Sequence, residues 1–240
     1  TVTDANGCGF TDSVYLGEVG APTMVIDSLV SPDCGLSNGA IYTTATGSGS
    51  LTYDWNSGAY TTDDISSIPS GTYTLLLTDG GCSNGYVVDF ASRTPDVTQV
   101  CLATVDTATN NNVVVWEEIP GIGLKEYWVY RKALFGESYE IVGIVPIDSL
   151  SFFIDTVANT DLVWWNYKLR TVDSCGAASG LSDAINHKTI HLNLYPAATA
   201  GDVKLKWNDY EGFSFPKYYI NEHTDATGWQ IIDSVANTIT

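Results

Sequence analysis

The sequence has few basic residues: 10 Lys and Arg stand against 28 Asp and Glu in 240 residues, for a formal net charge of −18. A surface of this sign repels phosphate backbones and anionic headgroups. We therefore expect no nucleic-acid partner and no attraction to anionic membranes. No stretch approaches the roughly 18 consecutive apolar residues of a membrane-spanning helix, so direct membrane insertion is not expected either.

The common catalytic and metal-binding signatures are also missing. There is no His-Glu-x-x-His, no Gly-x-Ser-x-Gly and no Gly-x-x-x-x-Gly-Lys motif. Glu117 and Glu118 are adjacent, so on a strand their carboxylates point to opposite faces and cannot act as a glycosidase pair. His187 and His191 are expected on the surface. We expect neither catalytic activity nor a cofactor.

Metal sites have little support as well. The five cysteines form no Cys-x-x-Cys pair, which disfavours zinc and fits an oxidising compartment. Calcium is left open as an alternative at Asp63-Asp64, although this pair lacks the alternating carboxylates of a calcium loop.

What the chain does contain is β-forming sequence. Aromatic residues make up 12%, with 7 Trp and 14 Tyr, and Met occurs once. Aromatic and β-branched residues suit half-buried pleated surfaces. Short alternating segments are separated by Gly, Ser and Asn turns, a pattern typical of β-sandwiches. In the segment 51–55, Leu51, Tyr53 and Trp55 share one face and are expected in a core. The sequence predicts an all-β chain of tandem sandwiches with almost no helix.

Two kinds of internal repeat divide the chain. Residues 1–8 (TVTDANGC) resemble residues 74–82 (TLLLTDGGC), and each is followed by another alternating strand. We therefore expect residues 1–20 to end a preceding repeat and residues 21–93 to be a complete one.

The second repeat is longer. Val113–Trp116, Tyr127–Tyr130 and Tyr139–Val145 recur as Val203–Trp207, Tyr218–Asn221 and Trp229–Val235. Residues 94–188 are expected to be one module and residues 189–240 a truncated second copy. A truncated copy exposes a sheet edge and part of a core, so we expect a longer native protein or a neighbouring chain to cover it.

The segment Cys34–Cys82 resembles the SprB-type repeat of Bacteroidetes gliding-motility adhesins. The resemblance rests on separate matches in the same order, which are Cys34-Gly35, Asn38–Ile41, Tyr53–Trp55, Ile68–Thr74, Thr78-Asp79 and Gly81-Cys82. Residues 94–240 resemble fibronectin type III modules of large secreted Bacteroidetes proteins, through Trp116, Trp207, the run Tyr127–Tyr130 and Tyr167. These resemblances imply Ig-like sandwiches, secretion by the type IX route, and an extracellular or cell-surface location.

We expect cysteines at the two ends of a repeat to pair. This pairs Cys34 with Cys82, at the ends of one repeat, and Cys101 with Cys175, at the ends of the first type III module. Cys8 is left over, with a partner expected in the missing part of the first domain or, less favoured, in another molecule.

Two further features concern ligands and modification. Alternation places Tyr127 and Val129 on one side of their strand and Trp128 and Tyr130 on the other, and it places Trp164 opposite Trp165, Tyr167 and Leu169. Trp128, Tyr130 and Trp164 are therefore candidate contacts for a sugar or a partner chain, although ordinary packing is the preferred interpretation.

Six Asp-[Ser/Thr]-aliphatic triplets resemble the O-glycosylation sequon of Bacteroidetes secreted proteins. A strand-end turn preference of Asp-Ser is the alternative explanation. The candidate acceptors are Ser13, Ser28, Thr107, Ser149, Thr156 and Ser234.

From these observations we expect a structural stalk or fibre segment of an extracellular adhesin or filament. Its partners would be other domains or copies of the same long chain. The alternative is a polysaccharide-binding accessory module of a secreted protein.

Overall fold

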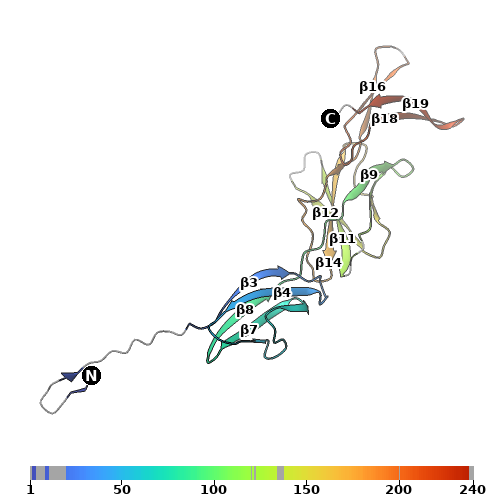
Figure 1. Cartoon of the computed structure of the whole chain (residues 1–240). Helices are drawn as coiled ribbons and strands as arrows, with labels where there is room; N and C mark the ends of the chain where they lie inside the picture. The colour runs from blue at the N-terminus through green and yellow to red at the C-terminus, as the bar shows by residue number, and fades with distance from the viewer. Residues whose placement is uncertain are drawn as a thin grey trace. The chain divides into compact units, whose positions relative to one another are not determined.

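The computed structural model describes residues 2–3, 9–10, 20–119, 121, 123–133, 138–199 and 201–237. Every regular element in these ranges is a β-strand (Figure 1), which confirms the predicted all-β class. The described ranges contain no helix that is long and apolar enough to cross a membrane. The chain divides into two compact units, Thr1–Arg93 and Thr94–Thr240.

The first unit is drawn in blue to green in Figure 1. Its strands are β1 (Val2–Thr3), β2 (Gly9–Phe10), β3 (Thr23–Val30), β4 (Gly39–Thr46), β5 (Leu51–Trp55), β6 (Ile65–Ile68), β7 (Gly71–Asp79) and β8 (Cys82–Phe90). The strands β1 and β2 pair as a short antiparallel hairpin. The others form two three-stranded sheets, in the orders β3-β4-β6 and β5-β7-β8.

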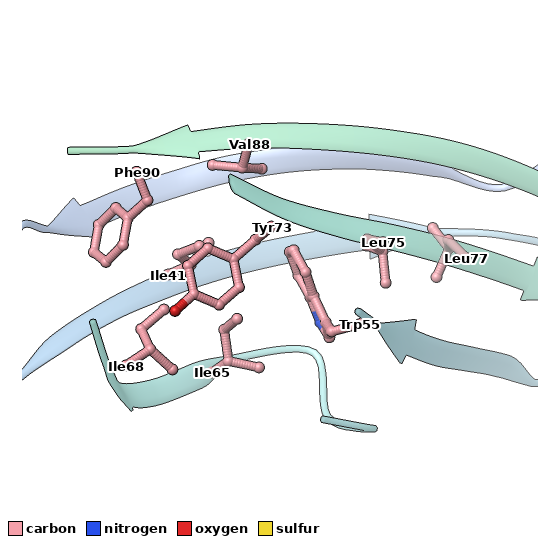
Figure 2. Packing of buried hydrophobic residues seen from close by; sticks show 9 residues of the cluster. All are labelled: Ile41, Trp55, Ile65, Ile68, Tyr73, Leu75, Leu77, Val88 and Phe90. Atoms are coloured by element: carbon pink, nitrogen blue, oxygen red, sulfur yellow. The ribbon is translucent and has the colours of Figure 1, made fainter. Parts of the chain in front are cut away.

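The two sheets of the first unit share one apolar core, because side chains that alternate along each strand point to the same side of its sheet. Trp55, Leu75 and Leu77 are at most 1% exposed, and they pack with residues of β4, β6 and β8. Figure 2 shows these side chains converging between the strands. Leu51 and Tyr53 are partly buried against the same cluster, so the predicted inward face of residues 51–55 is confirmed.

The second unit holds the remaining strands. These are β9 (Val100–Asp106), β10 (Asn111–Trp116), β11 (Leu124–Ala133), β12 (Glu140–Pro146), β13 (Phe152–Asp155), β14 (Trp165–Asp173), β15 (His187–Lys188), β16 (Leu192–Pro196), β17 (Val203–Trp207), β18 (Lys217–Thr224) and β19 (Gly228–Ala236). The order β13-β10-β9 makes a three-stranded sheet and β12-β11-β14-β15 a four-stranded one. The strands β16-β17 and β18-β19 form two separate hairpins.

The first seven of these strands enclose a core of their own. Tyr127 and Val129 of β11 and Tyr167 and Leu169 of β14 are fully buried, and they pack against β9 and β10. Trp165 packs partly buried against the same cluster. The faces that carry these residues are therefore the inward faces of the two strands.

The hairpin β18-β19 repeats the geometry of β11-β12. In β11-β12, Tyr127 pairs with Val145 and the register shifts after Val129. In β18-β19, Tyr218 pairs with Val235 and the register shifts after Ile220, the position equivalent to Val129. Because a bulge bends and twists a strand, its recurrence at the same position gives the two hairpins the same local shape.

Candidate functional site

The three aromatic residues predicted as ligand contacts do not form one patch. Trp128 and Trp164 are half-buried, whereas Tyr130 is only 8% exposed. Trp128 lies opposite Arg170 on β14, and Trp164 comes just before that strand begins at Trp165. The burial of Tyr130 agrees with the preferred interpretation, ordinary packing, and argues against a ligand contact at this residue.

Other chain segments lie against the outer face of the sheet that carries Tyr130. Lys168, which lies opposite Tyr130, donates a hydrogen bond from Nζ to the carbonyl oxygen of Leu181 at 3.2 Å. Arg170 donates to the carbonyl oxygens of Ala178 and Ser179. These bonds hold the segment 178–181 against the sheet, an arrangement that strand alternation cannot predict.

Trp164 instead contributes to a hollow of about 320 Å³. The hollow is lined by residues 162–164 before β14, by His191, by Asn193 and Tyr195 of β16, and by Lys206, Trp207 and Asn208. Three aromatic rings therefore meet two amides, an imidazole and an ammonium group. The ammonium of Lys188 lies 5.0 Å from the centroid of the Trp164 ring, a cation–π distance.

Hydrogen bonds around Asn208 hold this hollow in shape. The amide oxygen of Asn208 accepts from the backbone N–H of His191 at 2.7 Å, and its Nδ2 donates to the carbonyl oxygen of Thr189 at 2.9 Å. The Nδ1 of His191 lies 2.9 Å from the carbonyl oxygen of Thr160. The Thr189 hydroxyl accepts from the backbone N–H of Trp165 at 3.0 Å.

The chemistry of the hollow suits binding better than catalysis. Aromatic faces stack on the apolar faces of sugar rings, while amides bond to hydroxyls. None of the lining residues is an Asp or Glu, so the hollow does not offer the two carboxylates that glycoside hydrolysis uses. We refer to it as the Trp164 hollow.

A polar cluster lies inside the sandwich formed by β9–β15, and no sequence motif predicts it. The carboxylate of Asp155 accepts from Arg131 Nη1 at 2.8 and 2.9 Å and from the Tyr167 hydroxyl at 2.8 Å. The same hydroxyl accepts from Asn112 Nδ2 at 2.9 Å. Burial and the neighbouring Asp155 charge raise the pKa of Tyr167 far above its usual range. The cluster ties both sheets together, because Asn112 and Asp155 lie in one sheet and Arg131 and Tyr167 in the other.

His187 lies in the interior and not on the surface, contrary to expectation. It is 2% exposed, and its Nδ1 lies 2.9 Å from the hydroxyl of Tyr210. The ring of Phe213 is 6.3 Å from the imidazole. Burial lowers the pKa of His187. The aromatic segment 210–215, which follows β17, covers this imidazole, and the spacing of histidines along the sequence could not reveal that cover.

The predicted cysteine pairings are not those of the structure. Cys34 and Cys175 each belong to a disulfide, and the thiol of Cys101 is free and exposed. Cys34 precedes β4, whose first residue Gly39 packs against Phe90 at the end of β8. Cys82 begins β8, eight residue steps or about 27 Å away, whereas bonded cysteines have Cα atoms within about 7 Å. Cys8 lies outside the described residues.

The pairing of Cys101 with Cys175 fails for a similar reason. Thr98 and Thr171 face each other, with 2.8 Å between their hydroxyls. From that contact β9 runs toward Tyr167, while β14 continues away from Tyr167 toward Cys175. The two cysteines therefore lie on opposite sides of the Thr98–Thr171 contact.

The remaining candidate positions concern modification and calcium. Five of the six candidate acceptors are exposed, namely Ser28, Thr107, Ser149, Thr156 and Ser234, and Ser13 lies outside the described residues. The Asp64 carboxylate accepts a bond from the backbone N–H of Thr43 at 2.8 Å. Within the described residues, neither Asp63 nor Asp64 belongs to a group of three potential metal ligands.

No protein-family model matches the sequence, and no curated protein matches it. A two-domain fibronectin type III segment of chicken tenascin is 15% identical with a TM-score of 0.36, and the match covers 64% of this chain and 92% of that one. Domains A168–A170 of titin are 11% identical with a TM-score of 0.33, covering 70% of this chain and 63% of theirs. Domains FN1–FN3 of chicken CNTN1 are 10% identical with a TM-score of 0.31, covering 92% and 86%. The sheets and cores described above, and not these likenesses, define the fold as tandem β-sandwich domains.

Proposed function

We propose that this chain is a non-catalytic structural segment, a stalk or fibre subunit, of an extracellular bacterial surface adhesin or filament. The observation that carries the proposal is repetition: β18-β19 copies the register of β11-β12, including its bulge. The large aromatics of each copy pack against one another, as Trp116 does with Tyr127 and Trp207 with Tyr218. Repeated β-modules lengthen a chain without requiring a new site in each copy.

Several properties of the sequence support an extracellular setting. The resemblance of Cys34–Cys82 to the SprB-type repeat supports secretion by the type IX route of Bacteroidetes. The five exposed Asp-[Ser/Thr] hydroxyls are accessible to a glycosyltransferase. We propose them as O-glycosylation sites. An intact mass equal to that of the bare polypeptide, measured on natively secreted protein, would remove this part of the proposal.

Electron microscopy of the natively secreted protein, at high and low concentration, tests the structural role. Fibres with a regular axial repeat, or isolated extended particles, are the expected result. Compact particles that neither extend nor assemble would contradict it.

The Trp164 hollow supports a second candidate function, polysaccharide binding. Its three aromatic rings and two amides are the groups that recognise sugar rings and hydroxyls. Calorimetry with soluble polysaccharides should then show saturable binding that Trp164→Ala abolishes. Trp229→Ala is the matched control, because Trp229 is 58% exposed on β19 and does not line the hollow. Equal loss in both variants, or no binding by the unaltered chain, would reject this function.

A further inference from the structure

A second and larger groove lies between the hairpins β16-β17 and β18-β19. It has a volume of about 670 Å³, and most of its wall is hydrocarbon. The apolar lining includes Leu192, Leu194, Leu205, Trp207, Tyr218 and Ile220. Leu194 is 67% exposed and Leu192 is 52% exposed. Apolar residues gathered in a groove at this exposure mark a surface that another molecule covers.

The sandwich formed by β9–β15 of the same unit, here called the closed sandwich, shows which side chains complete a core of this kind. Trp116 and Tyr127 pack with ring centroids 5.3 Å apart at 60°, and Trp207 and Tyr218 repeat this contact at 5.6 Å and 64°. In the closed sandwich Tyr167 and Leu169 of β14 complete the core.

Those two side chains reach the core because β14 pairs along one edge of β11. Leu169 lies opposite Val129 and Tyr167 lies opposite Arg131. Within the described residues, β18 pairs with β19 alone. Its other edge, the one equivalent to the β14 side of β11, has no strand beside it in the part of the chain that the structure describes. The groove therefore lies where the strand equivalent to β14 would complete a core.

We propose that this groove binds a single antiparallel β-strand of a partner polypeptide, added along the free edge of β18. The strand carries a large apolar side chain opposite Ile220 and a basic side chain opposite Glu222. Main-chain hydrogen bonds to the open edge give affinity, and the alternating side chains give specificity. This site is carried by the geometry of the two hairpins and does not depend on the structural role proposed above.

The basic residue follows from a reversal of charge between the two copies. Glu222 occupies the position of Arg131, whose guanidinium is paired with Asp155 in the closed sandwich. Asp202 and Glu222 both line the groove, and its lining contains no Lys or Arg. A strand that covers the Glu222 carboxylate without supplying a cation would bury an unpaired charge, which is strongly unfavourable.

A second difference between the two repeats also favours a partner strand with a basic side chain. Val203 stands at the position of Asn112, whose amide bonds to the Tyr167 hydroxyl in the closed sandwich. Because Val203 offers no amide, a tyrosine of the partner strand at the position equivalent to Tyr167 would lack this hydrogen bond. The groove thus selects a lysine or arginine over the tyrosine found in β14.

Peptide binding to the full chain tests the proposal. The probe is the 11-residue peptide of residues 163–173 carrying Tyr167→Lys, and its matched control carries Tyr167→Glu. Fluorescence anisotropy measures the affinity of each peptide for the unaltered chain and for the variants Leu194→Asp, Glu222→Gln and Val87→Asp. Leu194 and Val87 are 67% and 69% exposed, so neither aspartate displaces a buried side chain, and Val87 lies on β8 in the other unit.

The lysine peptide should bind saturably and at least about tenfold more tightly than the glutamate peptide, as expected for a close, partly desolvated charge pair. Leu194→Asp should weaken the lysine peptide by about tenfold or more, and Val87→Asp should leave it unchanged. Glu222→Gln should reduce the preference for lysine to less than about threefold. Circular dichroism should show the same strand content in all variants.

Three results would overturn the proposal. The first is an absence of saturable binding by the lysine peptide. The second is equal affinity of the two peptides for the unaltered chain. The third is a stable dimer of the free chain that Leu194→Asp converts to monomer, since the groove would then be covered by a second copy.

Discussion

Replacing Asp155 with alanine should be among the most damaging single changes in the second unit. The carboxylate is 3% exposed and accepts bonds from Arg131 and from the Tyr167 hydroxyl, both at about 2.8–2.9 Å. It also accepts from the backbone N–H groups of Val157 and Ala158 at 3.1 Å. Asp155→Ala removes every one of these acceptors while the donors stay in place.

The magnitude follows from what is left behind. The Arg131 side chain is 14% exposed, so its guanidinium would be an unpaired charge with little access to water. Removing one partner of a buried ion pair costs about 3–5 kcal/mol. Tyr167→Phe should cost less, about 1–3 kcal/mol, because Asp155 keeps Arg131 while the Asn112 amide loses its acceptor.

Equilibrium urea unfolding, followed by tryptophan fluorescence, measures these losses. Asp161→Ala is the matched control, because that exposed carboxylate accepts one bond, from Asn110 Nδ2 at 2.9 Å, and its loss should cost about 0.5 kcal/mol or less. A free energy of unfolding for Asp155→Ala equal to that of Asp161→Ala would refute the reasoning. So would additive effects of Asp155→Ala and Tyr167→Phe, since groups in one network should couple.

Three further predictions concern other parts of the chain. Because burial lowers the pKa of His187 from its ordinary value of 6.5, its neutral form stabilises the fold above that pH. This contribution is lost as the pH falls below about 6.5, so His187→Phe should reduce the drop in thermal midpoint between pH 7 and 5. Trp55→Ala should cost about 3–5 kcal/mol in the first unit, because Trp55 is fully buried and its Nε1 donates to Thr62 O at 3.0 Å; a loss below about 1 kcal/mol on urea unfolding would contradict the packing. Alkylation and peptide mapping should modify Cys101 without reductant, and Cys34 and Cys175 only after reduction; modification of Cys175 in unreduced protein would contradict the bonding described here.

The sequence by itself determined the strands and which side chains share a face. Side chains alternate across a strand, so the grouping of Tyr127 with Val129, and of Tyr167 with Leu169, follows from period two and needs no knowledge of neighbouring strands. The core position of Trp55 was predicted in the same way. The repeat spacing also anticipated the common geometry of β11-β12 and β18-β19, since equal spacing between equivalent side chains requires equal strand and turn lengths.

Only the tertiary structure decided which residues from distant parts of the sequence meet. The segment 178–181 lies across the outer face of the sheet that carries Tyr130, and His187 is buried because residues 210–215 return over it. Which cysteines lie close together within a unit depends on the directions in which its strands run, and repeat boundaries do not specify that. Alternation assigns a side chain to a face of its sheet, but loops, bulges and strand direction decide what covers that face, and these are long-range properties of the fold.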